Sequence, residues 1–205
     1  MTRVAIYTHH TRNAALHKTL WSLHEARVPV HHIETQTSSP TQVRNRRNAH
    51  AALNAIAGNE AALILEDDIV PNAHLLAWLG WLETHSRHVT TLYAPNRKFY
   101  STTTPGLQTL QTLRGWYGAQ AVWIPPHKVH DIVTDPLFTI NEWHPYGPWD
   151  HAIRRHLLNR SERMNVVMPN LVQHQAPASV LPREGRRHTT PYFDAHAEPP
   201  QNGET

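Results

Sequence analysis

Hydrophobic and polar positions in the first half of the chain predict a regular alternation of strands and helices. Three short runs rich in apolar or β-branched residues predict strands, at Arg3–Thr8, Val28–Thr35 and Ala61–Leu65. The segments that follow them predict helices, at Arg12–Arg27, Thr41–Ala57 and Asn72–Thr84. Alternating strands and helices build a parallel sheet covered by helices, so this pattern predicts an α/β fold.

The second half of the chain has a less regular pattern. Short strands are predicted at Val89–Tyr93, within Leu113–Ile124 and at Asn165–Met168. Short helices are predicted at Pro125–Val133 and Pro148–Leu158. The polar, proline-containing stretch over residues 182–205 predicts a flexible C-terminal tail.

Composition restricts the class of protein without identifying its function. The chain has 205 residues, enough for one domain with a substantial core, and no cysteine, which excludes disulfides and thiolate metal sites. No apolar run approaches the roughly 20 residues of a membrane span, and the N-terminal residues lack a signal-peptide pattern, so a cytoplasmic protein is expected. A net charge of +3 and 18 histidines favour an anionic partner, such as a nucleotide diphosphate or a nucleic acid.

Three consecutive carboxylates, Glu66, Asp67 and Asp68, directly follow the last apolar run of the first half. They repel one another unless a cation lies among them, and such oxygen ligands suit Mg²⁺ or Mn²⁺, which neutralise phosphate oxygens. In an extended strand Glu66 and Asp68 point to one side and Asp67 to the other. Because ligands bind beyond the carboxyl ends of parallel strands, we expect these residues beside Thr8–Arg12. The alternative is a solvated acidic turn before Pro71.

The stretch that contains these carboxylates resembles a known family. Residues 44–71, RNRRNAHAALNAIAGNEAALILEDDIVP, resemble the donor half of GT-A-type glycosyltransferases, where a helix with Arg and Asn precedes a buried strand and a DxD-like metal motif. Three later segments are similar to the lipooligosaccharide and collagen glycosyltransferase-like branch, namely Gly115–Val133, Gly147–Leu157 and Met168–Ser179.

This resemblance covers most of residues 3–180 and implies a domain organisation. It implies one compact domain over residues 1–181, with a Rossmann-like, mostly parallel sheet flanked by helices. The donor half would span about residues 1–93 and the acceptor half about residues 94–181, followed by the tail over residues 182–205.

The resemblance also implies which residues bind the nucleotide. Thr8 and Arg12, after the first predicted strand, match the positions that hold the base and its ribose. Arg44 and Asn48 match the helix that faces the nucleotide. For Arg44, an ordinary surface arginine beside the core is the alternative.

A second group of residues is implied to bind the metal and the donor. Asp68 matches the direct ligand of the Mn²⁺ or Mg²⁺ ion. Glu66 matches the residue that supports the ribose or the metal through water, and Asp67 is assigned to the donor site with it. His174 matches a late histidine that completes the metal shell in several members of the fold. The alternative for His174 is an ordinary surface histidine.

Asp150 is the predicted catalytic residue. It lies in the sequence PWDH at the start of a predicted helix, where the helix dipole keeps a carboxylate ionised. As a general base it would take the proton of an acceptor hydroxyl that attacks the anomeric carbon, and a single displacement of this kind inverts that centre. A plain N-terminal helix cap is the alternative role of Asp150, and Glu142 is the second candidate for the base.

These observations predict a metal-dependent glycosyltransferase. Its donor would be a nucleotide sugar, with a UDP-sugar as the first expectation, and its acceptor a hydroxyl of a glycan. A hydroxylated base in DNA is the second acceptor considered, as in phage DNA modification, and the enzyme would then act in the cytoplasm of a phage-infected host.

Two other functions compete with this prediction. A nucleotidyltransferase would also use two acidic metal ligands, but such enzymes usually carry a glycine-rich loop after the first strand, and this chain has THHTRNA there. A non-catalytic nucleic-acid-binding protein would use the scattered arginines, which are Arg44, Arg46, Arg47, Arg154, Arg155, Arg183, Arg186 and Arg187.

Overall fold

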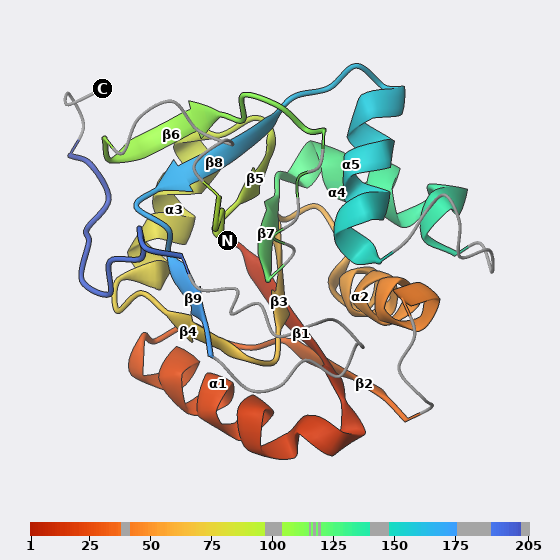
Figure 1. Cartoon of the computed structure of the whole chain (residues 1–205), viewed down its shortest axis with the longest axis horizontal. Helices are drawn as coiled ribbons and strands as arrows, with labels where there is room; N and C mark the ends of the chain where they lie inside the picture. The colour runs from red at the N-terminus through yellow and green to blue at the C-terminus, as the bar shows by residue number, and fades with distance from the viewer. Residues whose placement is uncertain are drawn as a thin grey trace.

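A mixed sheet forms the centre of the molecule in the computed structural model (Figure 1). The model describes residues 1–37, 42–96, 104–114, 116, 118, 120–139, 148–175 and 190–201. Within these residues the sheet has seven strands, which are β1 (Arg3–His9), β2 (His32–Gln36), β3 (Ala62–Glu66), β5 (Val89–Thr91), β6 (Gly106–Thr109), β7 (Ala121–Ile124) and β8 (Met164–Met168). Their spatial order is β2-β1-β3-β7-β5-β8-β6, and only β7 and β6 run against the others. The predicted α/β fold with a mostly parallel sheet is therefore confirmed.

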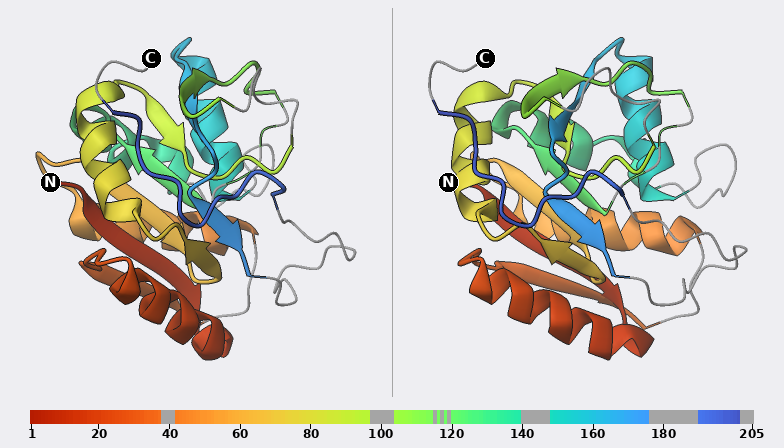
Figure 2. Two further views of the ribbon diagram at one scale, coloured as in Figure 1. Left: turned by 90° about the vertical axis from the view of Figure 1, so that its left-hand side faces the viewer. Right: turned by 60° about the vertical axis from the view of Figure 1, so that its left-hand side comes forward.

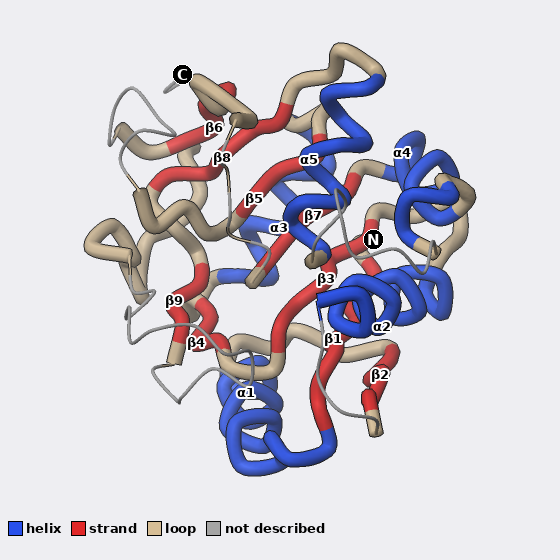
Figure 3. The backbone as a smooth tube through the Cα atoms, turned by 45° about the vertical axis from the view of Figure 1, so that its right-hand side comes forward, coloured by secondary structure: helices blue, strands red, loops and turns tan. Residues whose placement is uncertain are grey.

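Helices cover both faces of this sheet. They are α1 (Asn13–Glu25), α2 (Gln42–Ile56), α3 (Leu75–His85), α4 (Pro126–Val133) and α5 (Trp149–Asn159), with short 3-10 turns η1 (His10–Arg12) and η3 (Pro136–Phe138). Residues of α2, α4 and α5 form one core with one face of the sheet, and residues of α1 and α3 form a second core with the other face (Figures 1 and 3). In the described part of the chain, no helix combines the length and the apolar character needed to cross a membrane.

The predicted meeting of the first and third strands at one edge is confirmed. The strand β1 pairs in parallel with β3, and Tyr7 lies opposite Glu66 in this register. The four residues before Glu66 are fully buried, as a strand covered on both faces requires. The polar residues that follow Tyr7 and those that follow Leu65 therefore leave the sheet side by side.

A small second sheet was not predicted from the sequence. It pairs β4 (Ile69–Pro71) with β9 (Val172–His174) in antiparallel fashion, with Ile69 opposite His174. Each strand has three residues, too few for an alternating pattern to be recognised. This pairing brings His174 next to the turn that carries Asp68.

The C-terminal segment contacts the domain. Residues 190–201 run beside α3 and β9 (Figure 2). The side chains of Asn72 and Trp78 both donate hydrogen bonds to the carbonyl oxygen of Ala197, at 3.1 and 2.9 Å. These contacts tie the described part of residues 182–205 to the fold, while the domain boundary and the flexibility expected for that stretch stay predictions.

Candidate functional site

Five residues form an acidic cluster at the carboxyl edge of β1 and β3. Glu66 is the last residue of β3, Asp67 and Asp68 lie in the turn that follows it, Arg12 ends η1, and His174 ends β9. We call these five residues the acidic cluster. Asp67 and Asp68 are 2% and 1% exposed, so the alternative of a solvated acidic turn is wrong.

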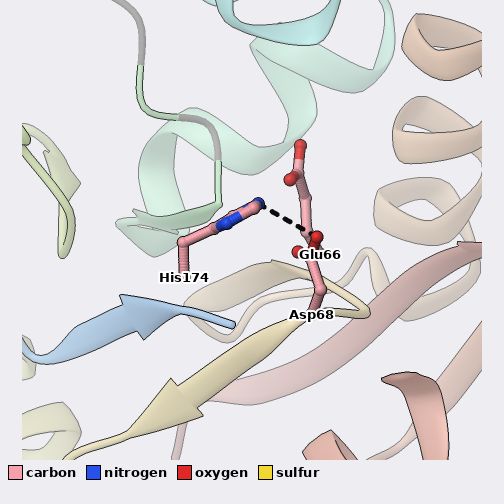
Figure 4. Close-up of side chains that lie close together, drawn as sticks. All are labelled: Glu66, Asp68 and His174. Atoms are coloured by element: carbon pink, nitrogen blue, oxygen red, sulfur yellow. Dashed lines mark ion pairs between the residues drawn. The ribbon is translucent and has the colours of Figure 1, made fainter. Parts of the chain in front are cut away.

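Three members of the acidic cluster are arranged as metal ligands. One ligand atom from each of Glu66, Asp68 and His174 lies within 4.8 Å of the other two. His174 points its ring toward Asp68, and its Nε2 lies 2.9 Å from Asp68 Oδ2 (Figure 4). The other oxygen, Asp68 Oδ1, is buried and has no hydrogen-bond partner in the described part of the chain. A buried carboxylate oxygen without a partner is costly, and a cation would satisfy it, so the residues present fit a divalent ion.

The turn that carries these carboxylates is fixed by its neighbours. Thr19, buried on α1, places its Oγ1 2.8 Å from the carbonyl oxygen of Asp67 and accepts a hydrogen bond from the Ile69 amide at 3.1 Å. The amide of Gln175 donates to the carbonyl oxygen of Asp68 at 2.6 Å. Sequence reasoning missed Thr19 and Gln175, because only the tertiary structure brings α1 and β9 to this turn.

Arg12 supplies part of the positive charge in the acidic cluster. Its Nε lies 3.3 Å from Asp67 Oδ1, and its Nη2 forms an ion pair with Asp68 Oδ2. The hydroxyl of Thr8 donates to Asp67 Oδ2. Arg12 and Thr8 therefore hold carboxylates in this structure, and their predicted contacts with base and ribose stay predictions. Three carboxylates face a single arginine here, so negative charge is in excess.

The pKa values of the acidic cluster follow from burial and from this excess. Burial, helped by the neighbouring Asp68, raises the pKa of Glu66 from 4.5 to about 7. Burial also raises the pKa of Asp67 and outweighs Arg12. For Asp68 burial is outweighed by His174 and Arg12, so its pKa lies below the usual range. Burial likewise opposes the charged form of His174, but Asp68 outweighs it and raises the pKa of His174.

Asn48 and Tyr7 complete the surroundings on the α2 side of the sheet. The side-chain amide of Asn48 donates to the Thr8 carbonyl oxygen at 2.8 Å, so it fixes the end of β1. The hydroxyl of Tyr7, which sequence reasoning missed, donates to Glu66 Oε1 at 2.7 Å. Arg44 belongs to α2, but its side chain lies outside the described residues.

Asp150 lies in the first turn of α5, where the sequence places it. Pro148 is the N-cap residue, and Asp150 follows it by two positions. Asp150 Oδ1 accepts a hydrogen bond from the His151 amide at 2.9 Å in this first turn, so the capping alternative stays open. The helix α5 packs on the face of the sheet to which Tyr7 belongs. The charge of Asp150 helps to raise the pKa of Tyr7, after burial and Glu66. Glu142, the second candidate for the base, lies outside the described residues.

Two of the arginines considered for nucleic-acid binding have defined surroundings, while Arg183, Arg186, Arg187 and the side chain of Arg44 lie outside the described residues. Arg46 is fully buried, and Arg47 donates from Nε and Nη2 to the carbonyl oxygen of Thr139 at 3.2 and 2.9 Å. A phosphate backbone cannot reach a buried guanidinium, so Arg46 is removed from that set.

Comparisons with known proteins identify the fold. Neither protein-family models nor curated protein sequences match the chain. A glycosyltransferase involved in glycosylating the major capsid of PBCV-1 has a similar structure, with a TM-score of 0.55 and 11% identity over 87% of this chain and 95% of its own. The A197 protein from STIV gives a TM-score of 0.54 and 11% identity over 85% and 86% of the two chains. A mutant Drosophila β-1,4-galactosyltransferase 7 was solved with manganese, UDP-Gal and xylobiose. It gives a TM-score of 0.52 and 11% identity over 85% of this chain and 71% of its own.

The chain has a GT-A-type glycosyltransferase fold. The resemblance to GT-A-type glycosyltransferases that the sequence indicated is therefore confirmed at the level of the fold. In this fold the acidic cluster lies at the carboxyl edge of the parallel strands, where ligands of such sheets bind.

Proposed function

We propose that this protein is a metal-dependent glycosyltransferase that moves a sugar from a nucleotide-sugar donor to an acceptor hydroxyl. The observation that carries the proposal is the trio of Glu66, Asp68 and His174 at the edge of a GT-A-type sheet. Its buried, unpartnered Asp68 Oδ1 is the feature that a purely structural ion-pair cluster would lack.

Asp68, Glu66 and His174 would hold Mn²⁺ or Mg²⁺. When bound, the ion supplies positive charge that offsets the negative charge developing on the leaving diphosphate. Support for manganese comes from the similar β-1,4-galactosyltransferase 7, which was solved with manganese and UDP-Gal.

The remaining donor residues would position the nucleotide. Arg12, 3.3 Å from Asp67, would contribute a second positive charge beside the diphosphate. Asn48 is bonded to Thr8 at the end of β1, where the nucleoside would lie. Arg44, a residue of α2, is proposed as a further contact to the nucleotide. A UDP-sugar is the donor that this proposal names first.

Asp150 would act as the general base. Its carboxylate would accept the proton of the acceptor hydroxyl as that oxygen forms a bond to the anomeric carbon. The bond between the anomeric carbon and the diphosphate oxygen breaks in the same step, and the nucleoside diphosphate leaves with both electrons. A single displacement of this kind would invert the anomeric centre.

A sugar hydroxyl is the acceptor that the comparisons favour. One similar structure is involved in glycosylating a viral capsid, and another was bound to xylobiose. Neither of these acceptors is DNA, so we propose a glycan and not a hydroxylated base.

A calorimetric nucleotide screen tests the proposal. Wild-type protein and Asp68→Asn are titrated with UDP, GDP, CDP and TDP, each with and without Mn²⁺. We expect one nucleotide to bind only with Mn²⁺, and this binding to be lost in Asp68→Asn. Asp131→Asn, on the exposed side of α4, serves as a matched control and should bind like wild type. Absence of binding by every nucleotide under every condition contradicts the proposal.

A further inference from the structure

Gln120 lies at the start of β7, on the same edge of the sheet as the acidic cluster. The strand β7 runs antiparallel to β3 with Ala121 opposite Leu65, so Gln120 comes opposite Glu66. The Glu66 amide donates to the Gln120 carbonyl oxygen at 2.9 Å, which confirms the pairing. Residues directly opposite in an antiparallel pair point to the same face, so the Gln120 side chain shares the face of Glu66.

Tyr7, Glu66 and Gln120 form a row across three neighbouring strands. Tyr7 on β1 lies opposite Glu66 on β3 and bonds to its carboxylate at 2.7 Å, so these two side chains also share a face. The strand order is β1-β3-β7, and neighbouring strands lie about 4.8 Å apart, so the row spans about 10 Å. The metal-ligand trio stands at the middle strand of this row.

The side-chain amide of Gln120 has an unmet hydrogen-bonding group. Its Oε1 is buried and has no partner among the residues that the structure describes. Two other glutamines near the acidic cluster use their amides fully or in part: Gln173 exchanges two hydrogen bonds with the backbone of Thr190, and Gln175 donates to the Ile69 carbonyl at 2.8 Å. A buried polar group without a partner in a folded protein commonly marks the place of a ligand or a water.

The backbone around Gln120 is held on both sides, so its side chain is presented from a fixed position. The Leu92 amide donates to the Ala121 carbonyl oxygen at 3.0 Å. Gly118 has a φ of +143°, and a Cβ there would lie 2.6 Å from the carbonyl oxygen of Tyr93. Only glycine fits this close approach, which packs the segment before β7 against Tyr93.

We infer that Gln120 contacts the transferred sugar of the donor and selects among sugars. The inference rests on the proposed function and extends it to the substrate. With the nucleoside at β1 and the diphosphate at the trio on β3, the sugar beyond the diphosphate reaches β7, where the free amide lies. An amide both donates and accepts, which suits a sugar hydroxyl, and a site built to bond a hydroxyl discriminates against a sugar that lacks it there.

The test compares UDP with three UDP-sugars. Affinities for UDP, UDP-glucose, UDP-galactose and UDP-N-acetylglucosamine are measured by calorimetry with Mn²⁺ for wild type and Gln120→Leu, together with thermal unfolding. Gln108→Leu on β6, at the far edge of the sheet, is the matched control. We expect wild type to prefer one UDP-sugar, and Gln120→Leu to lose roughly 3- to 15-fold of that preference while its affinity for UDP is unchanged. We also expect the melting temperature of Gln120→Leu to stay equal or rise, because the change removes a buried amide oxygen that has no partner.

The outcomes separate this inference from the proposed function. Absence of binding by every nucleotide in the screen above contradicts the proposed function, and the inference falls with it. If a nucleotide other than UDP binds, that nucleotide and its sugar derivatives take the place of UDP and the UDP-sugars in this test. Binding of UDP with an unchanged sugar preference in Gln120→Leu, or with no preference in wild type, overturns the inference alone. If Gln120→Leu melts at a lower temperature than wild type, Gln120→Met is measured in the same way, because methionine keeps the unbranched shape and length of glutamine. Retained preference in Gln120→Met would then overturn the inference, and lost preference would support it.

Discussion

Two clusters in this molecule are built from the same three residue types but differ in what they leave unsatisfied. In each, a buried aspartate pairs with a histidine and an arginine. The acidic cluster contains Asp68, His174 and Arg12, and a second one, which we call the packing cluster, consists of Asp135, His156 and Arg160. The histidine nitrogen lies 2.9 Å from the aspartate oxygen in the first and 2.7 Å in the second.

The aspartate of the packing cluster has both oxygens satisfied. Asp135 Oδ1 accepts from the Leu137 amide at 2.9 Å and so caps η3, while Oδ2 accepts from His156 and Arg160. The group left without a partner there is His156 Nε2, beside the ring of Phe138. In the acidic cluster the unpartnered atom is a carboxylate oxygen, which calls for a cation.

Charge separates the two clusters further. The packing cluster has one carboxylate for one arginine. Burial, reinforced by Arg160, lowers the pKa of His156 despite Asp135, so this histidine stays neutral. In the acidic cluster, Asp68 and the nearby Glu66 outweigh burial and raise the pKa of His174. The same three residue types therefore form a structural ion-pair cluster where charge is balanced, and a candidate metal site where negative charge is in excess.

The largest expected effect concerns Asp150, the proposed general base. Asp150→Asn should lower turnover by roughly 10²- to 10⁴-fold, because it removes the proposed general base, while nucleotide affinity stays close to wild type. Release of nucleoside diphosphate at saturating donor measures this change. An equal loss of nucleotide affinity would assign Asp150 to binding instead, and the conservative change Asp150→Glu should recover part of the turnover.

Replacing the histidine of each cluster tests whether only the acidic cluster binds a metal. His174→Gln should weaken Mn²⁺ binding by at least roughly 10- to 100-fold, the range for losing an outer-shell partner, because it removes a proposed direct ligand. His156→Gln should leave Mn²⁺ affinity unchanged and lower only the melting temperature, because its partner Asp135 is not part of the metal site. Equal loss of Mn²⁺ affinity in both variants would contradict the distinction.

The pH dependence of metal binding sharpens the comparison. The pKa of Glu66 is raised to about 7, so below that pH the carboxyl is protonated and the ion must displace a proton. Protonation of Glu66 should therefore lower Mn²⁺ affinity about tenfold per pH unit below pH 7, and protonation of His174, whose pKa is also raised, should make the fall steeper. Glu66→Gln should remove the contribution of Glu66 and leave a shallower dependence. Titrations between pH 5.5 and 8 measure it.

In the metal-free protein, the raised pKa of Glu66 makes the free energy of unfolding fall as the pH rises, whereas Mn²⁺ affinity rises with pH. The unfolded chain releases the Glu66 proton near its ordinary value of 4.5, whereas the folded protein keeps it to about 7. The contribution of Glu66 to the free energy of unfolding therefore falls as the pH rises from 4.5 to about 7. A metal-free protein whose Glu66→Gln variant shows the same decline as wild type would contradict this account.

The smallest expected effect lies in the packing cluster. Asp135→Asn keeps one oxygen that can cap η3 but loses the charged oxygen that accepts from His156 and from Arg160, whose side chain is 39% exposed. We expect a cost of about 1 kcal/mol, a fall of roughly 2–4 °C in melting temperature for a chain of this size, and unchanged Mn²⁺ binding. Chemical denaturation of the two proteins in parallel measures the difference.

The sequence could predict the parts of the site that local pattern controls. Glu66, Asp67 and Asp68 follow an apolar run, and the strand and helix alternation before them places Thr8 at the same edge. This was enough to predict a parallel edge bearing carboxylates, and the structure confirms it.

The parts that depend on long-range pairing could not be predicted from pattern. His174 reaches Asp68 through two three-residue strands that are far apart in sequence. Gln120 becomes a candidate only through the register of β7 on β3, which an apolar run such as AVWI does not encode. The packing cluster was missed because a histidine and an arginine on a helix look like surface residues until the contact with Asp135 is known.

Counting bound Mn²⁺ tests the central claim most directly. Electron paramagnetic resonance of free Mn²⁺ is measured during titration of wild type, Asp68→Asn and Asp135→Asn at pH 7.5. We predict one ion bound per chain in wild type and in Asp135→Asn, and none at the same concentrations in Asp68→Asn. Equal binding by wild type and Asp68→Asn, or no binding by wild type, would contradict the claim that the acidic cluster is a metal site.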